Sequence, residues 1–107
     1  MLNEAEQAWV GEVIARITEK MSWVSEKSKD KIPYTAIGGE HDDRSSTNPS
    51  GNAADGINWW TNGFWGGMLW LMHHETGHGK YKAIAEKSEA KLDRCFEEFD
   101  GLHHDVG

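Results

Sequence analysis

Apolar side chains recur at intervals of three and four residues near the start of the chain. Charged residues fall on the other faces, and Trp9 and Trp23 flank the apolar stripe. The stripe consists of Val10, Val13, Ile14, Ile17, Met21 and Val24. This period is typical of a helix with one buried face, so the pattern predicts an amphipathic helix over about residues 3–27.

The periodicity is lost over residues 28–60. This stretch holds both prolines, Pro33 and Pro49, and many Gly, Ser, Asn and Asp residues. It contains no pattern that predicts a strand, so we expect one long loop within the domain. Loops of this length in compact domains are usually functional or disordered. We therefore expect residues 40–48 to be mobile or to form a lid.

A second helix is predicted to begin near Thr61 and Asn62, both favourable N-cap residues. Its apolar residues lie nearly all round the helix, which predicts burial on most sides. They are Phe64, Trp65, Met68, Leu69, Trp70, Leu71 and Met72. Three glycines at 63, 66 and 67 weaken a helix and suggest close approach by another backbone or a ligand. Gly77 is the expected left-handed cap at the end of this helix.

A third helix is predicted over about residues 80–99, with one apolar stripe and one charged, solvated face. The stripe consists of Tyr81, Ile84, Ala85, Ser88, Leu92, Cys95, Phe96 and Phe99. A buried helix paired with a solvated one is what an inner and an outer ring of helices would need. The sequence thus predicts an all-α chain, with residues 1–107 forming a single domain at most.

The charge and the cysteine content of the chain exclude some classes of partner and of covalent cross-link. The net charge is −7, and no run of Lys or Arg is long enough to follow a phosphate backbone. Nucleic acid and anionic membranes are therefore not expected as partners. We see no signal peptide and no apolar run of spanning length, so the default expectation is a cytoplasmic protein. The single Cys95 allows no internal disulfide and is expected to be a small buried hydrophobe.

Two polar motifs have a chemical and a structural interpretation. His74-Glu75-Thr76-Gly77-His78 fits the H-E-x-x-H zinc motif, which needs both histidines on one face of a continuous helix. Gly77 should end the helix first, so an exposed turn is the preferred interpretation and no metal site is expected. His103-His104-Asp105 could supply a metal ligand, an acid–base pair or, through Asp105, the cap of a following helix.

A third motif is aromatic and spans residues 59–67, directly after the polar loop. Trp, Asn and Gly stand together there at the start of a helix, and the whole chain has six tryptophans. Flat apolar rings beside polar groups suit a sugar, which stacks its C–H face and hydrogen bonds its hydroxyls. Packing within the fold would explain the same residues, so both interpretations stay open.

These motifs together resemble glycoside hydrolase family 88, the unsaturated glucuronyl hydrolases of bacteria. The resemblance covers about residues 58–107, whereas the first helix is merely compatible and the loop from 30 to 55 is not recognisable. The residues that carry it are Trp60-Thr61-Asn62-Gly63-Phe64-Trp65-Gly66-Gly67-Met68-Leu69-Trp70-Leu71, Glu75-Thr76-Gly77 and His103-His104-Asp105-Val106-Gly107. The chain departs from the family at His73-His74 and His78-Gly79, which are expected to lie at a turn.

The resemblance implies a fold, a reaction and a set of residues. The fold is the N-terminal part of a six-hairpin α/α barrel, and no metal or organic cofactor is implied. The substrate class is an oligosaccharide from a polysaccharide lyase, with a C4=C5 unsaturated uronate at its non-reducing end. Asp105 matches the first of two essential aspartates, with His104 beside it. Trp60 matches an aromatic residue of the sugar subsite, and Asn62 falls where relatives carry Asn or Asp. Trp60, His104 and Asn62 are therefore expected to bind the substrate.

The same resemblance leaves alternatives and raises further expectations. An unsaturated rhamnogalacturonyl hydrolase has the same fold and chemistry, and a non-catalytic helical carbohydrate-binding or interaction module is the rival outside the enzymes. The second aspartate and the residues that hold the substrate carboxylate are expected beyond Gly107. We therefore expect the 107-residue chain to be inactive alone. Its incompletely covered apolar helix predicts a tendency to self-associate.

Overall fold

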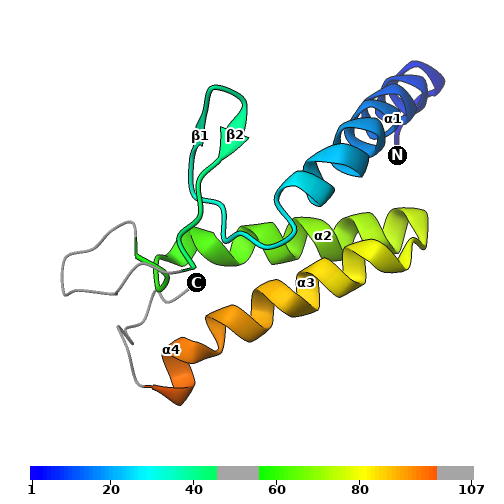
Figure 1. Ribbon diagram of the computed structural model, residues 1–107. Helices are drawn as coiled ribbons and strands as arrows, with labels where there is room; N and C mark the ends of the chain where they lie inside the picture. The colour runs from blue at the N-terminus through cyan, green and yellow to red at the C-terminus, as the bar shows by residue number, and fades with distance from the viewer. Residues whose placement is uncertain (46–55, 99–107) are drawn as a thin grey trace.

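The structure is a computed structural model that describes residues 1–45 and 56–98. Its main elements are three long helices, α1 (Glu4–Lys27), α2 (Gly63–Thr76) and α3 (Gly79–Leu92). Figure 1 shows α2 and α3 side by side and α1 crossing near them, with a small hairpin beside α1. The expected all-α class is confirmed, with a two-stranded hairpin as the one addition among the described residues.

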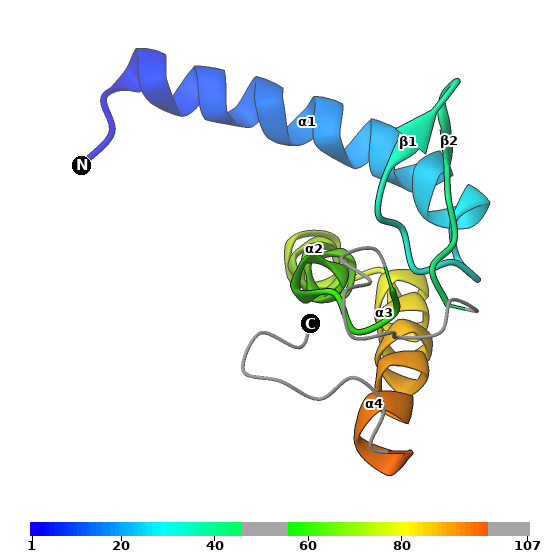
Figure 2. The same cartoon turned by 90° about the vertical axis from the view of Figure 1, so that its left-hand side faces the viewer.

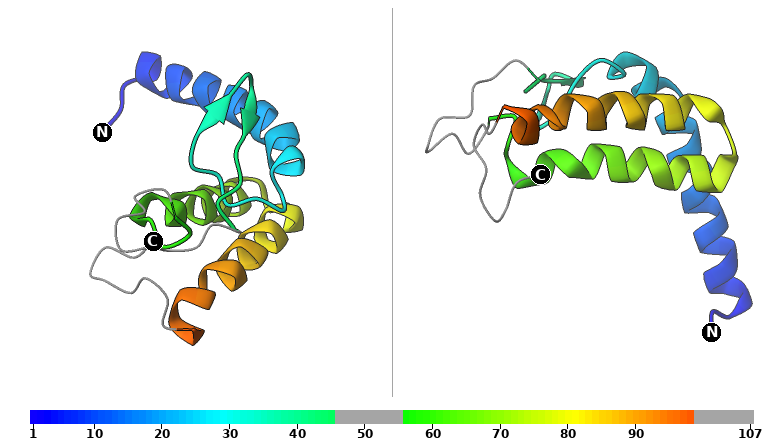
Figure 3. Two further views of the ribbon diagram at one scale, coloured as in Figure 1. Left: turned by 60° about the vertical axis from the view of Figure 1, so that its left-hand side comes forward. Right: turned by 90° about the horizontal axis from the view of Figure 1, so that it is seen from below.

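Helix α1 begins and ends where the sequence predicts. Asn3 and Glu6 form a reciprocal capping box, with N–O distances of 2.8 and 2.9 Å between side-chain oxygens and backbone amides. At the other end, the Ser28 backbone N–H donates to the Val24 carbonyl. The buried residues of α1, Met21 among them, lie in its C-terminal half. The N-terminal half projects away from the other helices (Figures 2 and 3).

Helices α2 and α3 form an antiparallel hairpin that contains the core (Figure 3). Gly77 joins them in the left-handed conformation (φ 72°) and donates its N–H to the His73 carbonyl, so the predicted cap is confirmed. The core cluster consists of Met21, Trp65, Leu69, Met72, Tyr81, Ile84 and Ala85. The Trp70 indole N–H also donates to the Glu89 carboxylate across the two helices, at 2.5 Å.

The expectation that α2 is buried on most sides is only partly met. Trp65 and Leu69 are buried, but Phe64, Met68 and Leu71 are exposed. Gly66 and Gly67 of α2 also show no unusually close approach. A Cβ at Gly66 would meet the Glu89 side chain at an ordinary 4.0 Å, and one at Gly67 would meet nothing. The second helix therefore has one covered face and one open face.

The expectation of a loop without strands was wrong for residues 36–41. Strands β1 (Ala36–Ile37) and β2 (Glu40–His41) pair antiparallel, with Gly38 and Gly39 at φ 60° and 80° between them. Two consecutive residues with positive φ make the tight hairpin turn that a Gly-Gly pair favours. Each strand is only two residues long, which is too short for alternating polarity to reveal it. The glycine pair was therefore the only usable signal.

Two aspartates hold the base of this hairpin. The Asp42 carboxylate accepts the backbone N–H groups of Tyr34 and Thr35, both at 2.8 Å, and pairs with the Arg44 guanidinium at 2.7 Å. Asp43 accepts the backbone N–H of Ile32 at 3.0 Å. Residues 40–45 of the expected lid are thus held by hydrogen bonds, whereas 46–48 lie outside the described residues.

The hairpin contacts both α1 and α2 through His41. The imidazole Nδ1 lies 2.7 Å from the Ser28 hydroxyl at the end of α1. The same ring packs edge-on against Trp65 of α2, with ring centroids 5.6 Å apart. A salt bridge from Lys27 to Glu40, at 2.5 Å, adds a second link to α1. These contacts place the hairpin at the junction of the two helices.

We predict that acid weakens this region. Burial alone would raise the pKa of Asp42, but the Thr35 and Tyr34 amides and Arg44 together lower it below the ordinary value of 3.8. A carboxylate with a lowered pKa stabilises the fold fully above that value, and the contribution is lost as the pH falls below it. Asp42→Asn should lower the free energy of unfolding by about 1–2 kcal/mol at neutral pH.

Urea unfolding of wild type and variant at about pH 6 and about pH 3 tests this expectation. The difference between the two proteins should shrink at the lower pH, because the unfolded wild-type chain then binds a proton at Asp42 that the folded carboxylate resists. Asp93→Asn, at an exposed aspartate that follows α3, serves as the matched control and should resemble wild type at both pH values. An Asp42 variant whose deficit stayed constant with pH would contradict the role given to this charge.

The third predicted helix is divided in the structure. Helix α3 ends at Leu92, and α4 (Arg94–Glu97) follows after Asp93, which keeps right-handed helical angles (φ −56°, ψ −23°). The backbone N–H of Glu97 donates to the Asp93 carbonyl, so the helical path continues with only a local break. Cys95 is buried as expected. The predicted end at Phe99 lies outside the described residues.

Candidate functional site

The segment before α2 forms two consecutive turns that lead into the helix. The Trp59 backbone N–H donates to the Gly56 carbonyl and the Asn62 N–H donates to the Trp59 carbonyl, each at 3.0 Å. A short 3-10 helix, η1 (Trp60–Asn62), then runs directly into α2. Ile57, within the first of these turns, is almost completely buried. This buried turn anchors the aromatic residues that follow it.

Asn62 is the polar centre of this segment. Its side chain is 0% exposed, and its amide Nδ2 donates to the carbonyls of Gly56 and Ile57, both at 2.9 Å. The carboxamide oxygen Oδ1 is buried and has no hydrogen-bond partner. The sequence suggested that Asn62 caps α2 with its side chain. The structure instead has no such cap bond, because the side chain turns back to the preceding turn.

Three aromatic rings meet at the start of α2. The Trp60 ring stands edge-on to Phe64, with centroids 5.5 Å apart and an interplanar angle of 87°. The Trp59 ring is tilted by 55° against Trp60 at a centroid distance of 6.2 Å. Trp60 is 47% exposed, and Phe64 is exposed as well. We call these three residues the aromatic cluster. It presents apolar ring surface to solvent, which suits stacking of a sugar face.

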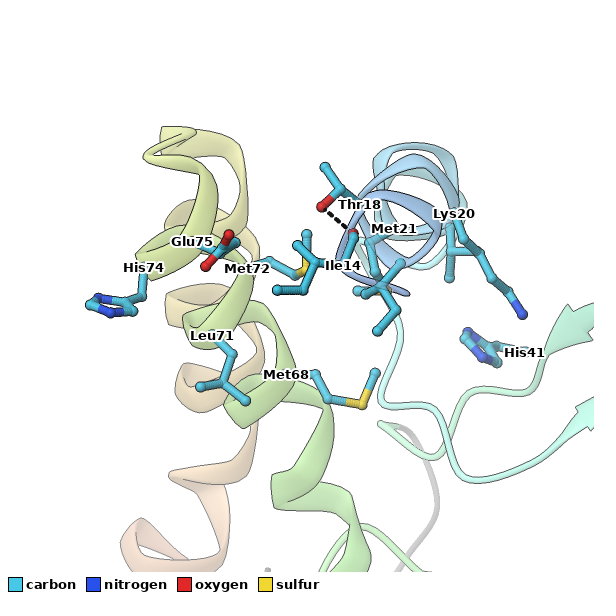
Figure 4. A pocket seen from close by; sticks show the side chains of 12 residues that line it. Ile14, Thr18, Lys20, Met21, His41, Met68, Leu71, Met72, His74 and Glu75 are labelled. Carbon is cyan, nitrogen blue, oxygen red and sulfur yellow. Dashed lines mark hydrogen bonds between the residues drawn. The ribbon is translucent and has the colours of Figure 1, made fainter. Parts of the chain in front are cut away.

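The open face of α2 continues from the aromatic cluster into a groove beside α1. Phe64, Met68 and Leu71 follow at helical spacing on this face and are all exposed. The groove has a volume of about 640 Å³, and side chains of both helices enter it, including Ile14 and Met72 (Figure 4). If the chain self-associates as predicted, this exposed apolar surface would form the contact. Self-association itself stays a prediction.

The H-E-x-x-H sequence does not lie on one helix. Helix α2 ends at Thr76, Gly77 reverses the chain, and His78 is the extended residue that precedes α3. His74 and His78 are both exposed, as the preferred interpretation of this motif expected. Within residues 1–45 and 56–98, no three His, Cys, Asp or Glu side chains are grouped so that they could hold a metal ion.

The four predicted site residues differ in what the structure says of them. Trp60 lies at the surface in the aromatic cluster, and Asn62 is buried and bonded to the preceding turn. His104 and Asp105 lie outside the described residues, so their place relative to Trp60 stays a prediction. The contact between Trp60 and Phe64 was not predicted from the sequence. Their spacing of four residues, which brings side chains together on a helix, would have indicated it.

Comparison with known proteins gives sequence relatives for nearly half of the chain. Over 49 residues it is 41% identical to the unsaturated glucuronyl hydrolase of Bacillus sp. (strain GL1). Over the same length it is 41% identical to the unsaturated chondroitin disaccharide hydrolase of Streptococcus pyogenes serotype M1. The enzyme of that name from Streptococcus pneumoniae (strain ATCC BAA-255 / R6) is 43% identical over 49 residues. The resemblance to unsaturated glucuronyl hydrolases is confirmed.

The similarity covers only part of this chain and only a small part of each relative. The matched segment covers 45% of this chain, 13% of the unsaturated glucuronyl hydrolase and 12% of each streptococcal enzyme. The chain therefore spans only a small part of the length of these relatives. No family model matches the chain, and no solved structure matches it. No helix in the described part of the chain has the length and apolar character of a membrane span.

Proposed function

We propose that the whole protein is an unsaturated glucuronyl hydrolase. Its substrates would be lyase-generated oligosaccharides that end in a C4=C5 unsaturated uronate. The observation that supports this most is the identity of 41–43% over 49 residues to three hydrolases named for unsaturated glucuronyl or chondroitin disaccharide substrates. The exposed aromatic cluster adds a surface of the kind that sugars use for stacking.

The proposed reaction is hydration of a vinyl ether. A carboxylic acid of the protein protonates the double bond, and water adds at C5. The resulting hemiketal opens and releases the neighbouring sugar. In this proposal Trp60 stacks on the unsaturated ring. Asp105 and His104 bind its hydroxyls, and a second aspartate beyond Gly107 is the acid. The two-carboxylate scheme of ordinary glycosidases does not apply.

Turnover of defined disaccharides tests the proposal. The whole protein is mixed with an unsaturated chondroitin disaccharide, and loss of the double bond is followed by absorbance. An unsaturated rhamnogalacturonyl disaccharide is the comparison substrate, because it carries the same double bond on a different neighbouring sugar. Faster turnover of the chondroitin substrate is expected. Preference for the pectin-derived substrate would assign the related hydrolase instead, and absence of both activities would contradict the proposal.

The 107-residue chain alone is expected to lack this activity. Trp60 and Phe64 lie on an open surface, so a bound sugar would stay in contact with water and be poorly oriented. Orientation accounts for several kcal/mol of a catalysed barrier, and the reaction also needs an acid poised near neutral pH. The same absorbance assay at high protein concentration measures this. Turnover by the chain within about tenfold of the whole protein would show a complete site.

A further inference from the structure

We propose that Asn62 is a positioning residue that holds Trp60 in place for the sugar, and that it does not itself contact the substrate. The part of this inference that concerns the sugar rests on the proposed function. The part that concerns the position of Trp60 does not depend on that function. The observation that carries it is the complete burial of the Asn62 side chain, two residues after an exposed tryptophan and hydrogen-bonded to the turn that precedes that tryptophan.

The hydrogen bonds of Asn62 explain how it would position its neighbour. Its two Nδ2 hydrogens are both used, one on the Gly56 carbonyl and one on the Ile57 carbonyl, each at 2.9 Å. The Gly56 carbonyl also accepts the Trp59 backbone N–H. The same carbonyl is therefore bonded both to the backbone of the turn and to the Asn62 side chain. Trp60 lies between these two anchored points. Its backbone is therefore fixed from both sides, and its ring leans on Phe64.

The same geometry argues against a direct contact with the sugar. Both donors of the amide are already bound to backbone, and the remaining acceptor, Oδ1, is buried. A sugar hydroxyl would have to enter the turn to reach it. Trp60, in contrast, is 47% exposed and needs no rearrangement to stack on a ring. The exposed indole is thus the group available to the substrate, and the buried amide is not.

Circular dichroism of the 107-residue chain tests the structural part. Trp59 and Trp60, with ring centroids 6.2 Å apart, should produce an exciton couplet. Trp60→Phe should remove this couplet and so identify it. Asn62→Ala should reduce it strongly while the helical signal stays. Leu69→Ala is the control for general loss of stability, and its couplet should persist while the chain is folded. An unchanged couplet in Asn62→Ala would overturn the proposal.

Kinetics of the whole protein test the functional part. Trp60→Ala and Asn62→Ala should each lower kcat/KM by about tenfold, as expected for loss of aromatic stacking. Trp9→Ala, at an exposed tryptophan on α1, should leave kcat/KM unchanged. The double variant of Trp60 and Asn62 should be no worse than Trp60→Ala, because both changes remove one interaction. Losses that multiply would mean that Asn62 acts separately from Trp60, which overturns the proposal.

A measurement on the unsubstituted chain decides the matter if Asn62→Ala does not fold. The side-chain amide protons of Asn62 should exchange slowly with solvent in an NMR experiment, because both are bonded inside the turn. Exchange at the rate of a free asparagine would overturn the proposal. If the whole protein turns over no unsaturated uronate, the proposed function fails, while the couplet and the exchange rate still decide whether Asn62 holds the turn.

Discussion

Leu69→Ala is expected to lower the free energy of unfolding by about 2–5 kcal/mol, the usual cost of an emptied core site. Leu69 is 0% exposed and belongs to the core cluster with Trp65, Met72 and Tyr81. It lies on the covered face of α2, in a cluster that contains residues of α1, α2 and α3. The loss is large for a chain of this size, since small domains have only about 5–15 kcal/mol of stability in total.

Leu71→Ala is the matched control for this experiment. Leu71 is the same residue type, two positions further along the same helix, but it is 69% exposed. Its replacement should change stability by less than about 0.5 kcal/mol. Urea unfolding followed by circular dichroism, repeated at several protein concentrations, measures both variants and reveals any self-association through the open face of α2. Equal losses for the two leucines would contradict the packing described above.

Asp105→Asn is expected to lower kcat of the whole protein by about 100-fold or more, the usual contribution of a group that assists proton transfer. In the proposed function Asp105 binds substrate hydroxyls. It also sets the pKa of the second aspartate, because paired carboxylates raise each other's pKa. The substitution keeps the size of the side chain and removes its charge. Loss of the unsaturated bond, followed by absorbance, measures the effect.

Asp93→Asn is the control for this prediction, because it makes the same chemical change at an exposed position after α3. It should keep activity close to wild type. The pH profile gives a second readout, since removal of the Asp105 charge should shift the acidity of the partner aspartate. Activity of Asp105→Asn close to wild type would end the assignment of Asp105 as a catalytic residue, although the family resemblance of residues 58–107 would remain.

The helices could be predicted from the sequence because their signals are local. The apolar stripe of α1 lies within the helix itself, and the structure begins and ends the helix close to where the stripe indicates. Gly77 likewise marks the end of α2, since a left-handed residue favours glycine wherever it occurs. The hairpin at 36–41 was missed, because its strands are too short to show a period and Asp42, rather than an extended ladder, holds its base.

The residue types of the candidate site were also visible in the sequence, but their roles were not. In the sequence, Trp60 and Asn62 lie two residues apart at the start of a helix, and both were expected to contact the sugar. The tertiary structure separates them, because it leaves Trp60 exposed and buries Asn62 completely. Whether a side chain faces solvent depends on what packs around the turn at Gly56 and Ile57. That packing is set by contacts between segments, which residue spacing does not encode.

The sequence by itself determined the helical class, both ends of α1, the glycine cap of α2 and the family that the aromatic motif resembles. Each of these depends on residue spacing within a short stretch. Only the tertiary structure decided which face of α2 is covered, because its apolar residues surround the helix and give no preferred side. Packing of α3 and of the C-terminal half of α1 buries Leu69 and leaves Leu71 exposed. The two residues are both leucines, so their chemistry alone does not distinguish them.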